Sequence, residues 1–274
     1  MQKYLITMML ALGLMAQAMI AAVAAPTSTV TYHSNKVVAD VKFDQNLSFD
    51  FSISFEHAVG LNETNFKVTA QRVSPFDSSI TSRLPDSMHT ALHDGFPVLI
   101  TVTARPDRGF AFTGEAQLEL YTQSIDFAEN LRLFRSHNQG QFEDITTLTA
   151  AGSLRAHGST GQFSDFLILV DDRDPQAQVA AKARELSSYL YSFVDSLGDD
   201  VGAELRALSR NAEAHVYEGR FNAAAAIVNN FIRVLERTSG DSIPDVWRSS
   251  DDIENVKGEL LTRARNLRFT LSQL

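Results

Sequence analysis

Asp171-Asp172-Arg173-Asp174-Pro175 stands where the hydrophobic period of the chain changes. Upstream, apolar and polar residues alternate, as in the run 47–55, and a period of two places the apolar side chains on one face of a strand. Downstream, apolar residues recur every three or four positions, as in 227–235, and this period indicates a helix. The pentapeptide therefore predicts a β unit followed by a helical unit, joined by a short acidic seam.

The part of the chain before the seam consists of strand-like segments. Turn-forming residues separate them, for example Asp44-Gln45-Asn46 and Asn138-Gln139-Gly140. Short strands at this spacing indicate an antiparallel sandwich. A long polar loop at 74–95 interrupts the series, and we expect one short amphipathic helical piece in it, around Leu84, Met88 and Leu92. The expected strands are 30–41, 47–55, 66–73, 97–104, 116–121, 131–134, 153–156 and 163–170.

The part of the chain after the seam consists of helix-like segments. Asp174 can cap a helix whose first residue is Pro175, because that position does not need the N–H that proline lacks. Gly198, Gly219 and a turn near Pro244 separate four amphipathic segments. Helices joined by short loops favour an antiparallel four-helix bundle. We therefore predict an α+β fold in two segregated domains, an all-β sandwich at 26–173 and a four-helix bundle at 174–274.

The first 24 residues have the pattern of a cleaved signal peptide. Lys3 provides the positive start, an apolar run follows, and Ala22-Val23-Ala24 is a small-residue cleavage site. We expect cleavage after Ala24, with a retained membrane anchor as the alternative. The mature protein is then exported to the periplasm or the extracellular space, with no retained membrane span. The chain has no cysteine, so each domain must fold without disulfides, and we interpret the host as bacterial.

The charge of the chain excludes one large class of partners. The formal net charge is −9 at pH 7, and no block of basic residues stands out. Proteins that bind nucleic acid need a basic surface to replace the counterions of the phosphates. We therefore expect no nucleic-acid partner.

Two stretches near the end of the β unit resemble a known module. They are Gln141-Phe142-Glu143-Asp144-Ile145-Thr146 and Thr160-Gly161-Gln162-Phe163-Ser164-Asp165-Phe166. Together with neighbouring segments, residues 115–170 resemble the last strands of immunoglobulin-like β-sandwich modules of bacterial secreted and surface proteins. The resemblance implies an Ig-like sandwich with an adhesion, spacer or scaffold role.

A second resemblance lies in the helical unit, over about residues 200–270. The segments Glu218-Gly219-Arg220-Phe221, Asn229-Asn230-Phe231-Ile232 and Ser239-Gly240-Asp241-Ser242-Ile243 are similar to the helical module called FIMAH. That module occurs at the ends of bacterial extracellular proteins. The turn 244–249 is longer than the pattern of the module. The resemblance implies an accessory role.

Few residues are candidates for chemistry or metal binding. His89 and His93 would share one face if the loop were helical there, but the third ligand of a zinc site is missing, so two solvated histidines are the alternative. Asp171, Asp172 and Asp174 could offer oxygens to calcium, but the chain lacks an Asp-x-Asp-x-Asp-Gly loop and helix capping explains Asp174. We therefore predict no catalytic residue, no metal and no cofactor.

Trp247 is the single tryptophan and lies in the last turn between helices. It is a candidate anchor for a partner, although a core position at the end of the bundle is the more common role of such a residue. The leading hypothesis is a non-enzymatic exported protein with an interaction or scaffold role, whose partner is an envelope protein or polymer. The alternatives are an envelope hydrolase with its site in the loop 74–95, and a glycan- or peptidoglycan-binding module.

Overall fold

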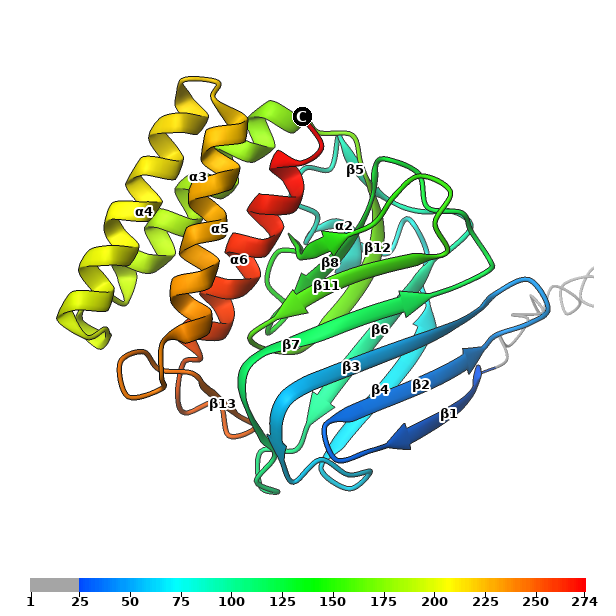
Figure 1. Ribbon diagram of the computed structural model, residues 1–274. Helices are drawn as coiled ribbons and strands as arrows, with labels where there is room; N and C mark the ends of the chain where they lie inside the picture. The colour runs from blue at the N-terminus through cyan, green and yellow to red at the C-terminus, as the bar shows by residue number, and fades with distance from the viewer. Residues whose placement is uncertain (1–24) are drawn as a thin grey trace, which may run out of the picture.

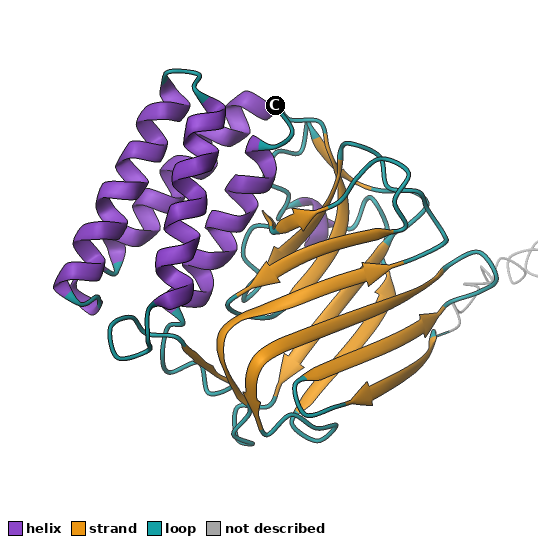
Figure 2. Ribbon diagram, viewed as in Figure 1, coloured by secondary structure: helices purple, strands orange, loops and turns teal. Residues whose placement is uncertain are grey.

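A computed structural model describes residues 25–274, so the predicted signal peptide at 1–24 lies outside the described residues. Two antiparallel sheets pack face to face, and we call them the two-sheet body. Four long helices, which we call the helical layer, lie along one side of it (Figures 1 and 2). The helical layer comprises α3 (Pro175–Ser192), α4 (Asp199–Tyr217), α5 (Phe221–Arg237) and α6 (Val256–Leu271), with a 3-10 turn at Val194–Ser196.

One sheet has seven strands, and six of them follow the order β1-β2-β3-β7-β11-β10, while β13 pairs with the first three residues of β7. These strands are β1 (Thr27–Tyr32), β2 (Lys36–Lys42), β3 (Ser48–Val59), β7 (Ala111–Tyr121), β10 (Thr146–Leu148), β11 (Arg155–Thr160) and β13 (Val246–Arg248).

The second sheet has six strands, five of them in the order β4-β6-β12-β8-β9, while β5 pairs with β12. The strands are β4 (Phe66–Arg72), β5 (Thr90–Leu92), β6 (Val98–Ala104), β8 (Leu131–Ser136), β9 (Glu143–Asp144) and β12 (Asp165–Asp171). A short helix, α2 (Ser78–Thr81), precedes β5.

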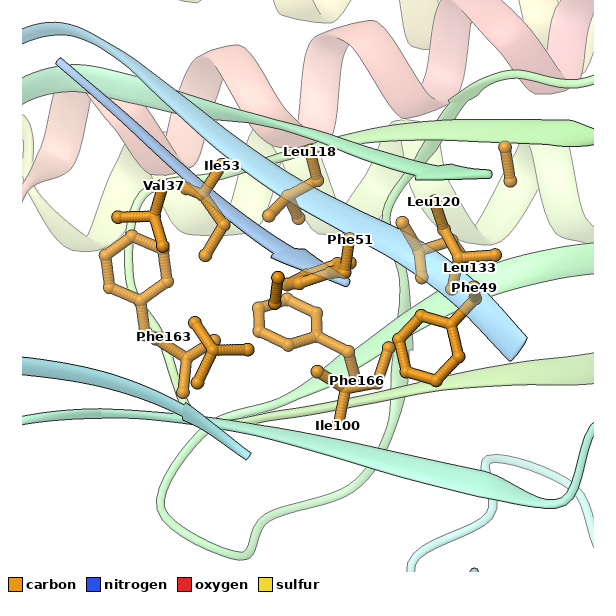
Figure 3. Close-up of a cluster of buried hydrophobic side chains, with 14 of the residues drawn as sticks. Val37, Phe49, Phe51, Ile53, Ile100, Leu118, Leu120, Leu133, Phe163 and Phe166 are labelled. Carbon is orange, nitrogen blue, oxygen red and sulfur yellow. The ribbon is translucent and has the colours of Figure 1, made fainter. Parts of the chain in front are cut away.

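The alternation of apolar and polar residues that predicted the strand 47–55 matches the alternation of buried and outward-facing side chains in β3. Phe49, Phe51, Ile53 and Phe55 are all buried between the two sheets, whereas the residues between them point away from this core (Figure 3). The ring of Phe51 lies 5.6 Å from that of Phe166 in the opposite sheet, a separation typical of tilted aromatic pairs. The phenylalanine stripe is therefore core, as its period predicts.

The predicted strands differ from the observed ones in three places. The predicted strand 30–41 is a hairpin of β1 and β2, because the backbone reverses at His33 and pairs Tyr32 with Val37. Within the loop 74–95, α2 and β5 replace the expected amphipathic piece around Leu84, Met88 and Leu92. Strands of two or three residues, such as β9 and β13, are too short to show a period.

The start of α3 and the end of α4 follow the capping signals of the sequence. Asp174 accepts hydrogen bonds from the backbone N–H groups of Gln176 and Ala177, at 3.3 and 3.2 Å, and Pro175 is the first residue of α3. This confirms the predicted cap at the seam. Gly219, with φ of +71°, ends α4 in the left-handed conformation that glycine adopts without strain.

The predicted fold class, two segregated domains with an Ig-like sandwich and an independent four-helix bundle, is wrong. Strands do occupy the first half of the chain and helices the second, but β13 comes from the helical half and pairs with β7. In addition, α6 lies against β7 and β11 (Figure 1) and against β10. Its polar residues Lys257, Glu259, Thr262 and Asn266 are buried rather than solvated. The two halves are therefore joined by buried contacts of β13 and α6 with the seven-stranded sheet.

Trp247 lies among these contacts and not at the end of a bundle. It pairs with Phe112 across β13 and β7, and its ring lies 5.5 to 6.0 Å from the rings of Phe110, Phe112 and Phe163. Because only 7 % of the residue is exposed, the ring is not available as an anchor for a partner. The only tryptophan of the helical half belongs to the core of the two-sheet body.

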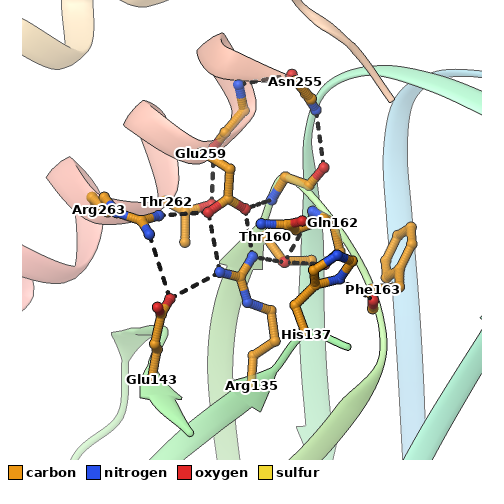
Figure 4. A network of polar contacts seen from close by, with 12 residues as sticks. Arg135, His137, Glu143, Thr160, Gln162, Phe163, Asn255, Glu259, Thr262 and Arg263 are labelled. Atoms are coloured by element: carbon orange, nitrogen blue, oxygen red, sulfur yellow. Dashed lines mark hydrogen bonds and ion pairs between the residues drawn. The ribbon is translucent and has the colours of Figure 1, made fainter. Parts of the chain in front are cut away.

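A buried ionic network also joins α6 to the sheets (Figure 4). Glu259 accepts hydrogen bonds from Arg135 and Arg263, and its Oε1 also accepts one of 3.0 Å from the backbone N–H of Gly161. Burial alone would raise the pKa of Glu259, but the two guanidinium groups outweigh that effect and hold the pKa well below its ordinary value. Asn255, the N-cap of α6, donates to the carbonyl oxygens of Gly114 and Gly161.

None of the helices between residues 25 and 274 combines the length and the apolar character needed to cross a bilayer.

Candidate functional site

The acidic seam connects β12 to α3, and each of its carboxylates has a separate partner. Asp171 receives two hydrogen bonds from the guanidinium of Arg173, at 2.7 and 2.8 Å. Asp172 accepts one of 2.7 Å from Asn130, and Asp174 caps α3. The structure therefore does not bring the three carboxylates of the calcium hypothesis together. Within residues 25–274, no group of three or more His, Asp or Glu side chains is arranged to hold a metal.

Behind the seam, a buried ion pair connects three elements. Lys182 of α3 donates to Asp144 of β9 at 2.6 Å and to Thr270 of α6 at 2.8 Å. The side chains of Asp144 and Lys182 are only 2 % and 10 % exposed. Burial alone would raise the pKa of Asp144, but Lys182 and the hydrogen bonds from Thr146 outweigh it and lower the pKa. Asp144 is therefore an ionised, fixed anchor.

Two polar cavities lie on either side of this ion pair, and we call them together the seam cleft. Their volumes are about 130 and about 320 Å³. Both are lined by Asp144, Arg173, Gln178 and Lys182, so they meet at the buried pair. The remaining lining residues are Pro85, Gln141, Phe142, Glu143, Ile145, Glu185, Thr262, Arg263 and Asn266 of the smaller cavity, and Glu129, Asn130, Arg132, Asp171, Asp172, Pro175, Thr270 and Gln273 of the larger one.

Several charged groups that line the seam cleft are held in place. The ion pairs Asp144–Lys182 and Asp171–Arg173 fix four of them. Fixed, paired charges orient a ligand without the cost of rearrangement on binding.

The loop 74–95 does not assemble its two histidines into a site. His89 and His93 lie on either side of β5, whose extended backbone pairs with 169–171 of β12, so they do not share a helix face. The ring of His89 lies 2.8 Å from the carboxylate of Asp86, and this contact lowers the pKa of Asp86. His93 accepts a hydrogen bond from the backbone N–H of Gly95.

Sequence reasoning missed the central pair of the seam cleft. The sequence places Asp144 in a turn next to Thr146, and the bond of 2.9 Å from the Thr146 N–H to the Asp144 side chain agrees with that interpretation. The partner of Asp144 lies 38 residues away in the chain. One signal was present, because Lys182 falls between Val179 and Leu186 on the apolar face of the helix. A charge at such a position requires a buried partner.

Comparison with known proteins places the whole described chain in one family. No curated protein matches the sequence. Neither the resemblance to Ig-like modules nor that to FIMAH is confirmed by the family comparison. One family matches residues 9–274, so that a single match covers both the strands and the helices. The chain therefore belongs to the family of unknown function DUF6689.

Proposed function

We propose that this protein is an exported, non-enzymatic binding protein that holds a basic segment of an envelope protein in the seam cleft. The observation that carries the proposal is the buried Asp144–Lys182 pair, which lies at the junction of both cavities and is contributed by a strand and a helix. Export rests on the predicted signal peptide with cleavage after Ala24, and it places the partner in the periplasm or outside the cell.

The charges of the cleft support a basic ligand. Six acidic residues line the two cavities, against four basic ones. The acidic residues are Glu129, Glu143, Asp144, Asp171, Asp172 and Glu185, and the basic ones are Arg132, Arg173, Lys182 and Arg263. Complementary charge increases the association rate and the specificity of such an interface, and its contribution weakens with salt. The proposed complex therefore loses affinity at high ionic strength.

A pair of matched variants tests the proposal. Gln178 is partly buried, is uncharged and lines both cavities, so Gln178→Trp fills the cleft without removing a charge. Gln176 is exposed on the same helix and lines neither cavity, so Gln176→Trp is the control. Each tagged variant is expressed in the native host, cross-linked and recovered from the envelope fraction.

We expect the wild type and Gln176→Trp to recover the same envelope protein and Gln178→Trp to lose it by about tenfold or more. A synthetic peptide from the basic region of that protein then binds the wild type with an affinity that falls as salt is added. Equal recovery by all three proteins, or the absence of any specific partner, contradicts the proposal.

A further inference from the structure

The strand β1 is a free edge of the seven-stranded sheet. It stands at the end of the strand order, and no strand between residues 25 and 274 pairs with its outer side. Figure 1 shows β1 on the side of the two-sheet body that lies away from the helical layer. A free edge presents main-chain N–H and C=O groups to which another strand can bind.

The strands at the other ends of the two strand orders have features that oppose pairing. The strand β4 carries the exposed residues Lys67 and Arg72. The strands β9 and β10 are only two and three residues long. In addition, β10 lies against α6, and Asp144 of β9 binds Lys182 of α3. By contrast, β1 has six residues and none of them is charged, so its edge is left open.

The register of the β1–β2 hairpin shows which main-chain groups of β1 face outward. The N–H of His33 donates to the carbonyl oxygen of Lys36 at 2.8 Å, so these two residues form a hydrogen-bonded pair. Hydrogen-bonded and non-hydrogen-bonded pairs alternate along antiparallel strands. Counting back from His33, the residues that exchange no main-chain bonds with β2 are Tyr32, Val30 and Ser28. Their N–H and C=O groups therefore point to the open side.

Contacts on the core side hold β1 in position. Val30 and Tyr32 pack against the core of the two-sheet body. The hydroxyl of Tyr32 also donates a hydrogen bond of 2.7 Å to the carbonyl oxygen of Phe66 in β4, which belongs to the other sheet. The side chains of Thr29 and Thr31 are exposed. Because the edge is already ordered, it loses little conformational freedom when a second strand binds.

We infer that two copies of this chain bind each other by antiparallel pairing of their β1 strands. Pro26 lacks an N–H and the hairpin turn begins at His33, so the stretch that can pair is centred on Val30. A twofold axis at this centre places Val30 opposite its own copy and Ser28 opposite Tyr32 of the other copy. Each of the three resulting pairs exchanges two main-chain hydrogen bonds, about six in all.

The side chains of β1 suit this register. It places Thr29 opposite Thr31 of the other copy, and such threonine pairs stabilise neighbouring strands. Val30 meets Val30 of the other copy beside the core, which gives an apolar contact. No like charges meet, because β1 contains no charged residue. An edge that is complementary to itself in hydrogen bonds and in charge favours a second copy of the chain over a charged segment of another protein.

Sedimentation velocity of the chain, as processed in the native host, tests the inference. We expect a monomer–dimer equilibrium with a Kd of about 100 µM or tighter. The double variant Thr29→Lys/Thr31→Lys places like charges of the two copies opposite each other and should weaken the dimer about 10-fold or more. Thr29→Glu/Thr31→Glu should do the same. An equal mixture of the two variants should recover a dimer at least as strong as that of the wild type, because opposite charges then face each other.

The matched control is Thr69→Lys/Gln71→Lys, which adds the same two charges at exposed positions of β4 and should dimerise like the wild type. Gln178→Trp in the seam cleft should also leave the dimer unchanged, and this separates the two proposed sites. If one double variant of β1 does not fold, as judged by circular dichroism, the other decides the question.

Three results would overturn the inference. In the first, the wild type stays monomeric up to about 1 mM, which leaves the edge for a strand of another protein. In the second, the two double variants of β1 dimerise as strongly as the wild type. In the third, the control on β4 loses the dimer as they do, which would place the contact elsewhere.

Discussion

Arg135 of β8 and Glu259 of α6 form an ion pair that is almost fully buried, although 124 residues separate them in the chain. The side chains are 2 % and 1 % exposed. A second guanidinium, that of Arg263, donates to the same carboxylate at 2.5 Å. This pair is where the helical layer is fixed to the two-sheet body, so its removal should destabilise the whole fold rather than one half.

Breaking this pair on one side should be strongly destabilising. Glu259→Ala leaves the buried guanidinium of Arg135 without its main counter-charge, so we expect the free energy of unfolding to fall by about 3–5 kcal/mol. Urea denaturation measures the change. The control is Asp44→Ala, which removes an exposed partner of Arg72 and two hydrogen bonds within its own turn, and it should lower the free energy of unfolding far less than Glu259→Ala does. Similar losses for the two variants would mean that the buried pair has no special role.

The close approach of α6 to the turn after β11 depends on a glycine. A methyl group at Gly161 would lie 2.7 Å from the backbone nitrogen of Glu259 and 2.9 Å from the carbonyl carbon of Gly258. Because backbone atoms cannot move aside like a flexible side chain, we expect Gly161→Ala to lower the free energy of unfolding by about 1–3 kcal/mol or more.

Gly198→Ala is the matched control for this substitution, since the nearest atom to its added methyl group would be 3.6 Å away. We expect it to change the free energy of unfolding by less than about 1 kcal/mol. Thermal unfolding followed by calorimetry compares the two variants. If Gly161→Ala is as stable as Gly198→Ala, the contact between α6 and β11 is looser than the distances indicate.

The two buried carboxylates make stability depend on pH in a defined direction. Asp144 and Glu259 both have a lowered pKa in the folded protein, whereas in the unfolded chain each returns to its ordinary value near 4. Their contribution to stability is therefore fully present above the unfolded-state pKa. It is lost progressively as the pH falls from that value through the folded-state pKa.

Glu259→Gln and Asp144→Asn should each reduce the acid sensitivity of the fold. Between about pH 6 and pH 3, the free energy of unfolding should fall less steeply in these variants than in the wild type, although they are less stable at neutral pH. Urea midpoints measured across this range provide the comparison. Glu204→Gln, at an exposed carboxylate, should keep the slope of the wild type. An unchanged slope in all three variants would exclude these two groups as the source.

The sequence predicted the local elements well and the long-range contacts poorly. The run 47–55 and the cap at Asp174 are signals that neighbouring residues carry, so the alternating strand and the start of α3 could be predicted. The position of α6 could not, because its polar residues, such as Glu259 and Asn266, have the pattern of a solvated face. They are buried because their partners, Arg135 and the carbonyl of Thr146, come from distant strands.

The candidate site, too, could be predicted only in part from the sequence. Asp171 and Asp172 were recognised as chemically notable, and both line the seam cleft. The pair Asp144–Lys182 at its centre depends on how α3 lies against β9, and no local pattern encodes that arrangement. A lysine on an apolar helix face was the single available indication.

Unfolding followed by two probes tests whether the two halves form one cooperative unit. Trp247 is the only tryptophan and lies in the core of the two-sheet body, so its fluorescence reports on the sheets. Far-ultraviolet circular dichroism reports mainly on the helical layer. Because β13 and α6 bind the halves together, we expect the two urea transitions to coincide within error.

The variant Glu259→Ala extends this comparison, because it weakens the contact of α6 with the sheets and leaves the tryptophan in place. In the wild type the midpoints should be the same, and in Glu259→Ala both should shift together to lower urea. Segregated domains would instead give two separate wild-type midpoints, and the substitution would move only the helical one. That result would show that the sheets and the helices unfold as independent units, and that the contacts of β13 and α6 do not couple them.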